Sequence, residues 1–236
     1  VGEIIKQAKQ LNVKKIIITN PRKFIEAKQK FSKKFIIHND FENLNKLFTP
    51  CLIVEKSKLI NNIERLSSRI CKEKTKFRPH LKTAKCKKIT EIFTKYFGYR
   101  AMVSTIEEIE QLKDCGITDF LYSVAIVPNK LKRIASCLSD NCQVTVSIDH
   151  ISIANELVNF CEVEGCKISA VIELDFDGHR SGVRPNAEKQ LIEIGKCLSD
   201  AGLFRGVMSH AGASYNLSNN QDSVSYTHLT LPTRIF

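Results

Sequence analysis

Basic and apolar residues alternate in the segment FRPHLK, residues 77–82. A strand has a side-chain period of two, so a strand here puts the three basic side chains on one face and the three apolar ones on the other. A face with three unpaired cations is costly to bury in an apolar core. A bound anion removes that cost, so the pattern indicates an anion site formed by Arg78, His80 and Lys82.

A solvated basic surface is the other interpretation of this segment, because the chain around it is rich in lysine. Further lysines stand nearby at Lys72, Lys74, Lys76, Lys85, Lys87 and Lys88. A module that binds free anions or nucleic acid through this face would bind with a steep salt dependence and would carry no chromophore.

Two later segments also place polar groups where predicted strands end. One is residues 173–183, ELDFDGHRSGV, and the other is residues 206–215, GVMSHAGASY. An acidic strand end with a glycine-rich turn and a core histidine would explain them without any chemistry. Their positions after strands favour a site, because parallel α/β proteins gather their chemistry at the carboxyl ends of strands.

Regular alternation of strands and helices must position these groups. Strands are expected at residues 77–81, 99–103, 119–124, 142–149, 167–175 and 204–210, and helices at 86–97, 104–116, 128–138, 151–165 and 186–202. The helix at 104–116 has Ser104 or Thr105 as N-cap and Gly116 at its end. Strands this apolar predict a parallel sheet covered by helices.

The first 47 residues form an α/β extension of unknown origin. Helix-like patterns at residues 3–12 and 21–31 alternate with strand-like ones at 14–20 and 33–39, and Asp40 is a plausible N-cap for a following helix. This extension holds 11 Lys or Arg against 4 Asp or Glu, which is +7 of the net charge of +11. The excess charge therefore predicts solvated helix faces rather than a nucleic-acid surface.

Composition limits the class of protein. A hydrophobic content of 43% in 236 residues is enough for one sizeable core. No apolar run approaches the roughly 20 residues of a membrane span, and there is no secretory leader pattern, so a cytoplasmic protein without membrane or nucleic-acid partners is expected. The nine cysteines show no metal-binding framework and are expected to be reduced thiols.

The motifs resemble those of the D-threonine aldolase and D-serine dehydratase family of pyridoxal phosphate enzymes, whose barrel is shared with the alanine racemase N-terminal domain. TPCLIVEKSKLINNIERL at residues 49–66 resembles the opening TPxLxxDxxxLxxNI, with Glu55 in place of Asp, and RPHLKTAK at 78–85 resembles RPHxKxxK. The resemblance implies an incomplete (β/α)8 barrel over residues 48–223, with about six strands and without the carboxy-terminal β domain.

The resemblance also assigns roles to single residues. It implies that Lys82 carries the cofactor as a Schiff base and acts as the catalytic base, with Arg78 and His80 beside it. In the racemase motif KxDTGxxRxG a carbamylated Lys stands where this chain has Glu173, followed by Asp175 and Arg180. Glu173 would supply that negative charge directly and hold Arg180 against the cofactor.

In the third motif, GxxxHxGxSY, the resemblance places His210 against the face of the pyridine ring. Ser214 and Tyr215 would line the substrate or phosphate side. The phosphate cradle, the partner of the pyridine nitrogen and the ligands of a divalent metal would lie outside this chain.

The implied activity is that of a pyridoxal phosphate-dependent lyase acting on β-hydroxy D-amino acids, either as an aldolase or as a dehydratase. A non-catalytic pyridoxal phosphate carrier and an amino-acid racemase on the same barrel are the alternatives. The chain by itself is expected to be inactive, and the longer protein could form a homodimer. A small D-amino acid is the expected partner.

The carboxy-terminal residues 224–236 are expected not to belong to the protein. Residues 224–233, VSYTHLTLPT, resemble the translation of a sequencing adapter. His228 is therefore not used as a ligand.

Overall fold

The computed structural model describes residues 35–38, 52–73, 76–139 and 141–217. The chain divides into two compact units. The first comprises residues 1–100 and 114–117, and the second comprises residues 101–113 and 118–236.

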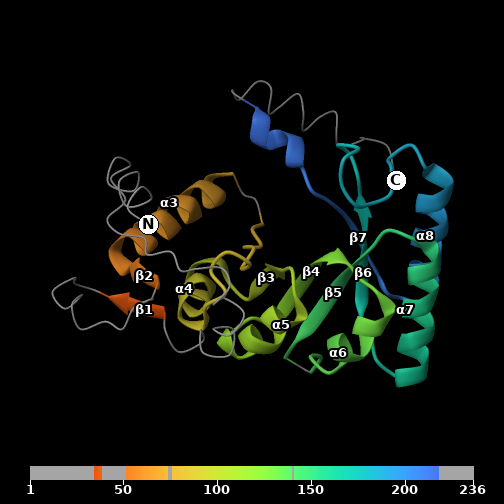
Figure 1. Ribbon diagram of the computed structural model, residues 1–236, viewed down its shortest axis with the longest axis horizontal. Coiled ribbons are helices and arrows are strands. Elements are labelled where there is room, and N and C mark those ends of the chain that lie inside the picture. Colours follow the sequence, from red (N-terminus) through yellow and green to blue (C-terminus); the bar gives the residue numbers. More distant parts are fainter. Residues whose placement is uncertain (1–34, 39–51, 74–75, 140, 218–236) are drawn as a thin grey trace, which may run out of the picture. The chain divides into compact units, whose positions relative to one another are not determined.

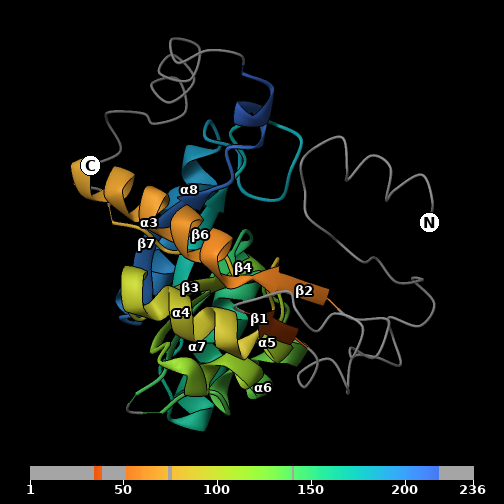
Figure 2. The same ribbon diagram turned by 90° about the vertical axis from the view of Figure 1, so that its left-hand side faces the viewer.

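The first unit contains a small sheet and two helices. Strand β1 (Phe35–His38) pairs in parallel with β2 (Leu52–Glu55), which leads into α3 (Lys56–Lys72). Helix α4 (Lys87–Phe97) lies beside α3 (Figure 2). Partly exposed phenylalanines pack together in this unit. The rings of Phe77 and Phe97 meet edge to face with centroids 4.9 Å apart, and those of Phe93 and Phe97 have centroids 5.7 Å apart.

The second unit is built on a five-stranded sheet with the order β3-β4-β5-β6-β7. The strands are β3 (Arg100–Val103), β4 (Asp119–Ala125), β5 (Gln143–Ile148), β6 (Ser169–Leu174) and β7 (Phe204–Ser209). The pairs β4–β5, β5–β6 and β6–β7 are parallel. Nearly every residue of β5 and β6 is buried, as expected for strands covered on both faces.

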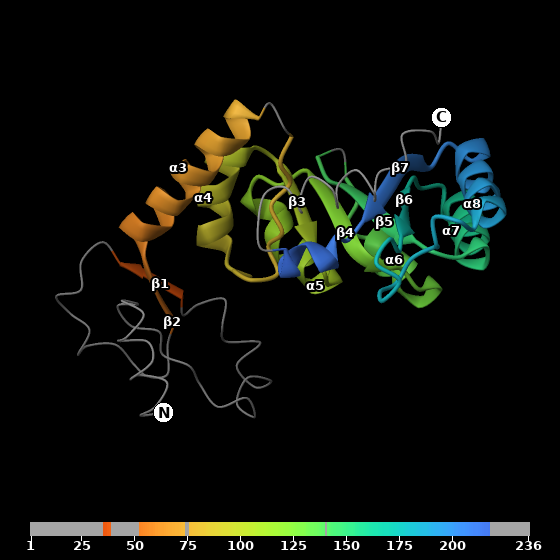
Figure 3. The same cartoon turned by 90° about the horizontal axis from the view of Figure 1, so that it is seen from above.

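Helices follow the strands in the predicted order. They are α5 (Ile106–Leu112), α6 (Leu131–Ala135), α7 (Ile151–Glu164) and α8 (Glu188–Asp200), with short 3-10 turns at Lys113–Cys115, Pro128–Lys130 and Gly212–Asn216. Helices α7 and α8 lie side by side against the sheet, where α8 contacts β6 and β7 (Figures 1 and 3).

An ion pair between distant strands shows that the sheet is curved. Arg205 on β7 donates to both carboxylate oxygens of Asp119 on β4, at 3.2 and 2.9 Å, and to the Thr145 hydroxyl on β5 at 2.8 Å. In a flat sheet β4 and β7 would be about 14 Å apart, because neighbouring strands are separated by about 4.8 Å. The two side chains could bridge that distance only if both lay fully extended along the sheet, whereas strand side chains stand roughly perpendicular to it. The strands therefore curl towards one another as in a barrel.

Most predicted elements are confirmed within one to three residues. The N-cap of α5 is Thr105, whose hydroxyl accepts the amide N–H of Glu108 at 3.3 Å, and the Glu108 carboxylate accepts the N–H of Ser104 at 2.8 Å. The predicted helix at 128–138 is shorter and begins as a 3-10 turn. Of the predicted 1–47 extension only the strand Phe35–His38 is described, and residues 224–236 also lie outside the described part.

The strand predicted at residues 77–81 is wrong. Residues 76–79 have no regular structure, His80 forms a single bridge, and a turn follows over residues 81–84. Pro79 has no N–H to give to a ladder, which explains why the strand pattern does not become a strand. The alternation survives only in part, because Pro79 and Leu81 are buried while Lys82 is exposed.

Candidate functional site

The first predicted site segment belongs to the first unit. Lys82 has an exposed side chain, and its backbone N–H donates to Nδ1 of His80 at 3.2 Å. The turn is closed by the N–H of Lys85, which donates to the carbonyl of Leu81 at 3.0 Å, and Lys85 has a φ of 42°. Arg78 and His80 are partly buried. The side chain of Leu81 is thus buried and holds the segment in place, while the Lys82 side chain is exposed to solvent.

In the second unit, Glu173 lies near the carboxyl end of β6 and is only 5% exposed. Its Oε2 accepts the hydroxyl of Ser147 on β5 at 3.3 Å. Burial raises the pKa of the Glu173 carboxyl, the Ser147 and Ser181 hydroxyls lower it, Asp149 raises it and Arg180 lowers it from a distance. Glu173 is therefore a buried acid whose hydrogen bonds come from neutral hydroxyl groups, while Arg180 acts on it only at longer range.

The loop after β6 is organised by a second buried acid. Asp175 Oδ1 accepts the N–H of Gly178 at 2.8 Å and that of Arg180 at 3.3 Å, while its Oδ2 faces Nε of Arg184 at 3.5 Å. The loop then returns to the strand, because the N–H of Val183 donates to the Glu173 carbonyl at 2.8 Å. These bonds fix the backbone from which the Arg180 side chain extends.

The turn after β7 carries the third motif. His210 and Tyr215 meet edge to face with ring centroids 5.9 Å apart, and the tyrosine hydroxyl lies 3.5 Å from Nε2 of His210. Ser214 donates its hydroxyl to the carbonyl of Ala211 at 2.6 Å. Tyr215 is 74% exposed, so one side of this pair is open to a small molecule.

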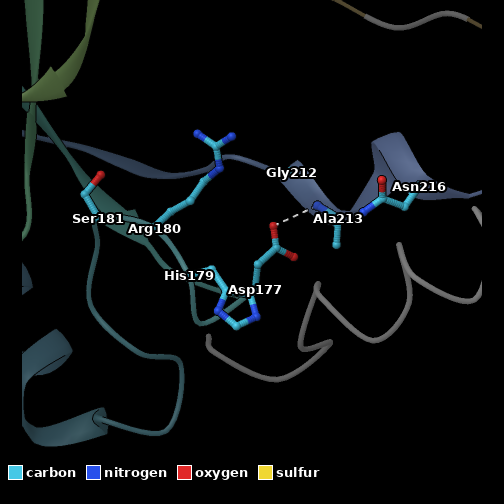
Figure 4. A pocket seen from close by; sticks show the side chains of 7 residues that line it. All are labelled: Asp177, His179, Arg180, Ser181, Gly212, Ala213 and Asn216. Atoms are coloured by element: carbon cyan, nitrogen blue, oxygen red, sulfur yellow. Dashed lines mark hydrogen bonds between the residues drawn. The ribbon is translucent and has the colours of Figure 1, made fainter.

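The two loops meet at a pocket of about 550 Å³ (Figure 4). It is lined by Asp177, His179, Arg180, Ser181, Gly212, Ala213 and Asn216. Asp177 joins the loops, because its Oδ2 accepts the N–H of Ala213 at 3.0 Å. A Cβ at Gly212 would lie 2.8 Å from Nε of Arg180, so the absence of a side chain there leaves room for the guanidinium.

The structure thus brings Arg180 and the turn containing His210, Ser214 and Tyr215 to the same end of the sheet. The predicted ion pair between Glu173 and Arg180 is not formed among the described residues. The Glu173 carboxylate lies in the strand and bonds to Ser147, whereas Arg180 is exposed in the loop and points towards Gly212. Glu173 and Arg180 are therefore joined by the backbone of the loop and not by a direct bond between their side chains.

Sequence reasoning missed Ser147, Asp177 and Gly212. Ser147 stands between the apolar Val146 and Ile148 in β5, and a hydroxyl in a strand that is expected to be buried is a detectable signal. Asp177 gives no such signal, and Gly212 is a fixed glycine of the motif GxxxHxGxSY whose role the motif does not reveal. The importance of both comes from a contact between two loops that are distant in sequence.

A model of the alanine racemase N-terminal domain matches residues 54–230. The chain belongs to the alanine racemase N-terminal domain family. The predicted fold class is thereby confirmed, and so is the suspected relationship to D-amino-acid lyases, whose members recur among the relatives of this alanine racemase-like chain.

Two curated relatives illustrate that relationship. D-threo-3-hydroxyaspartate dehydratase of Delftia sp. is 32% identical over 177 residues, which are 75% of this chain and 47% of the relative. D-serine dehydratase of Dictyostelium discoideum is 27% identical over 198 residues, which are 77% of this chain and 49% of the relative. The chain therefore spans about half the length of the curated relatives it matches.

A solved structure of the Delftia dehydratase aligns with a TM-score of 0.72 and 30% sequence identity, covering 78% of this chain and 49% of that one. Another structure of a D-threo-3-hydroxyaspartate dehydratase is a metal-free form of a mutant. In the part of this chain that the structure describes, no group of three or more His, Cys, Asp or Glu side chains could hold a metal ion. Within the same residues, no helix is both long and apolar enough to cross a bilayer.

Proposed function

We propose that this chain supplies the catalytic lysine and part of the cofactor site of a pyridoxal phosphate-dependent lyase that acts on β-hydroxy D-amino acids. The observation that carries the proposal is the pocket between the loops after β6 and β7, with Arg180 on one side and the His210 turn next to the other. Dehydratases of such amino acids among the relatives support the choice of reaction.

The residues of the pocket fit pyridoxal phosphate chemically. The cofactor is a flat, anionic molecule, and the pocket offers the guanidinium of Arg180, the amide of Asn216 and the imidazole of His179. Gly212 has no Cβ, which lets the guanidinium lie close to the loop backbone at the edge of the pocket. His210 and Tyr215 add an aromatic pair of the kind that packs against such rings.

Pyridoxal phosphate, when bound, supplies an electron sink for negative charge at the carbon next to the substrate amine. The residues of this chain then have separate roles. Lys82 would hold the cofactor and move a proton at the substrate α-carbon, as the resemblance of RPHLKTAK to RPHxKxxK implies. Its side chain is exposed on a turn that is held by the buried Leu81, so the amine is accessible. Arg180 would donate to the cofactor, and His210 would pack against it. Arg78, His80, Ser214 and Tyr215 complete the polar surroundings.

In this proposal Glu173 positions the pocket loop and does not itself contact the cofactor. It is buried and bonded to Ser147, so it fixes the end of β6 from which the Asp175 loop begins. Its position therefore controls where Arg180 is presented. A divalent metal that binds the substrate hydroxyl belongs to the proposal for the full-length protein, with ligands outside the described residues.

Binding of the cofactor can be tested on the full-length gene product. Purified protein with added pyridoxal phosphate should absorb as a lysine-linked cofactor, and borohydride should fix the cofactor mass on the peptide containing Lys82. Lys82→Ala should lose both signals, whereas Lys88→Ala, which removes an exposed lysine of α4, should keep them. A colourless wild-type protein with excess cofactor would sink the proposal.

The reaction is tested with D-serine, D-threonine and D-3-hydroxyaspartate in the presence of a divalent metal. A dehydratase releases ammonia and a keto acid, while an aldolase releases glycine and an aldehyde, and either result supports the lyase. Racemisation of alanine without these products would assign the chain to the other branch of the family. The 236-residue chain alone should give none of these products.

A further inference from the structure

Helix α7 ends in a turn that brings two cysteines together. Gly165 follows the helix with φ 60° and ψ 32°, and its N–H donates to the carbonyl of Cys161. The N–H of Cys166 donates to the same carbonyl at 3.1 Å. The six-residue closure with a left-handed glycine is the 6→1 bond of a Schellman turn, in which the side chains of the first and last residues frequently touch. Here those residues are Cys161 and Cys166.

The electrostatics of the two thiols agrees with that contact. Burial raises the pKa of Cys161 to about 11, the backbone of Ile168 lowers it through a hydrogen bond, and the neighbouring Cys166 thiol raises it. Both cysteines are reduced, Cys161 is 7% exposed, and Cys166 is partly exposed. The pair therefore has one thiol that a reagent can reach and one buried partner beside it.

We propose that Cys161 and Cys166 form a redox-active dithiol that a small disulfide, such as oxidised glutathione, converts to an intramolecular disulfide. The Cys166 thiolate attacks one glutathione sulfur, which forms a mixed disulfide and releases one glutathione thiolate. Cys161 then loses its proton to solvent and attacks the Cys166 sulfur, which releases the second glutathione thiolate. Two protein thiols and one small disulfide become one protein disulfide and two small thiols, so atoms and electrons balance.

The dithiol is separate from the pocket. Cys166 lies ahead of the first residue of β6, whereas Glu173 and the Asp175 loop lie at the other end of that strand. The disulfide would join the last turn of α7 to the segment that leads into β6. Oxidation therefore constrains this corner of the unit without adding a group to the pocket.

The chain contains its own control. Cys137 and Cys142 have the same spacing, but both side chains are buried. Each of these cysteines forms hydrogen bonds with a different residue. Cys137 donates its thiol to the carbonyl of Arg133 at 3.3 Å, whereas the backbone of Cys142 pairs with Ser139. Spacing alone would predict the same behaviour for both pairs, while the turn geometry predicts a disulfide only at Cys161 and Cys166.

The experiment uses the whole chain with the exposed Cys71 replaced by Ser, so that this thiol does not consume the reagent. After incubation with oxidised glutathione and alkylation of free thiols, peptide mass mapping should show the Cys161–Cys166 link and no Cys137–Cys142 link. Cys166→Ala should leave Cys161 unmodified, because the exposed attacking thiol is gone. Mixed glutathione disulfides on both cysteines of the wild-type pair, or two free thiols, would overturn the proposal.

A pair of glycine variants distinguishes an effect of this turn on disulfide closure from an effect of lower overall stability. Gly165 and Gly202 both have left-handed φ values, 60° and 66°, and a Cβ at either would meet no atom within 4 Å. Gly165→Ala should slow ring closure by roughly fivefold or more, because a left-handed alanine costs about 1–2 kcal/mol. Gly202→Ala carries the same strain at the end of α8 and should leave the closure rate unchanged. Equal slowing by both variants would contradict the role of this turn.

Discussion

At the scale of single residues, Glu173 is a carboxylate in a strand whose neighbours are apolar. It is 5% exposed, and burial is the largest influence on its pKa, which is raised above the ordinary value of 4.5. The Ser147 hydroxyl compensates only in part for the water that the carboxylate loses. A buried acid of this kind lowers the stability of the fold. It also places a fixed polar group beneath the pocket loop.

This burial predicts how stability depends on pH. The folded state binds the Glu173 proton more tightly than the unfolded state. The resulting contribution to the free energy of unfolding is fully present below about pH 4.5 and is lost as the pH rises through the raised folded pKa. Glu173→Gln should remove that loss and be more stable than wild type at pH 7. Urea unfolding from pH 4 to 8 measures the difference.

The matched control is Glu188→Gln, which removes an exposed carboxylate at the start of α8. Its difference from wild type should not grow across the same pH range. A Glu173→Gln difference that stays flat from pH 4 to 8 would show that the acid is not penalised by burial.

At the scale of elements, the loop from Asp175 to Val183 is closed by hydrogen bonds to the end of β6. Leu174 and Val183 form a parallel bridge, and the loop amides converge on the Asp175 carboxylate. Gly182 makes this return possible with a φ of 124°. A Cβ there would lie 2.7 Å from the backbone nitrogen of Asp175 and 2.9 Å from the carbonyl oxygen of Glu173.

Gly182→Ala should therefore destabilise the protein by about 2–4 kcal/mol, because neither the left-handed conformation nor the clash with backbone can be relieved by a side-chain movement. Gly202→Ala, with a left-handed φ but open space, should cost only about 1–2 kcal/mol. Urea denaturation of the two variants measures both values. Equal costs would mean that the loop is not closed as described.

At the scale of the whole second unit, Arg205, Asp119 and Thr145 hold three strands together at the end of the sheet opposite to the pocket. Asp119 is 4% exposed, so its carboxylate depends on the arginine for charge balance. Polar groups at this end of a barrel usually serve stability, while those at the carboxyl end serve chemistry.

Asp119→Ala should destabilise the protein by about 2–3 kcal/mol, since it removes two charge-assisted bonds and leaves a partly exposed arginine without its carboxylate partner. The arginine side chain is 37% exposed and regains some hydration, which keeps the cost below that of a fully buried pair. Thermal unfolding should show a lower midpoint, with cofactor affinity per folded molecule unchanged.

The comparison variant is Glu110→Ala, which breaks the Arg133–Glu110 fork on exposed helix faces. It should change the midpoint far less, because water screens that pair. A similar loss in both variants would mean that the Asp119 pair does not join the strands.

The sequence alone determined the order of most strands and helices, limited the N-cap of α5 to Ser104 or Thr105, and predicted the segments that we propose for the site. These are local properties, since hydrophobic periodicity, turn residues and short motifs depend on residues close together in the chain. It also predicted the family, because three motifs occur in the family's order. The strand at residues 77–81 was the local failure, and Pro79 was the signal that should have prevented it.

Only the tertiary structure decided which groups meet. The contact of Asp177 with Ala213, the room that Gly212 leaves for Arg180, and the bond from Ser147 to Glu173 each join residues more than 25 positions apart. The distance between Glu173 and Arg180 was likewise decided by the return of one loop. Such contacts depend on strand register and loop closure, which sequence periodicity does not encode.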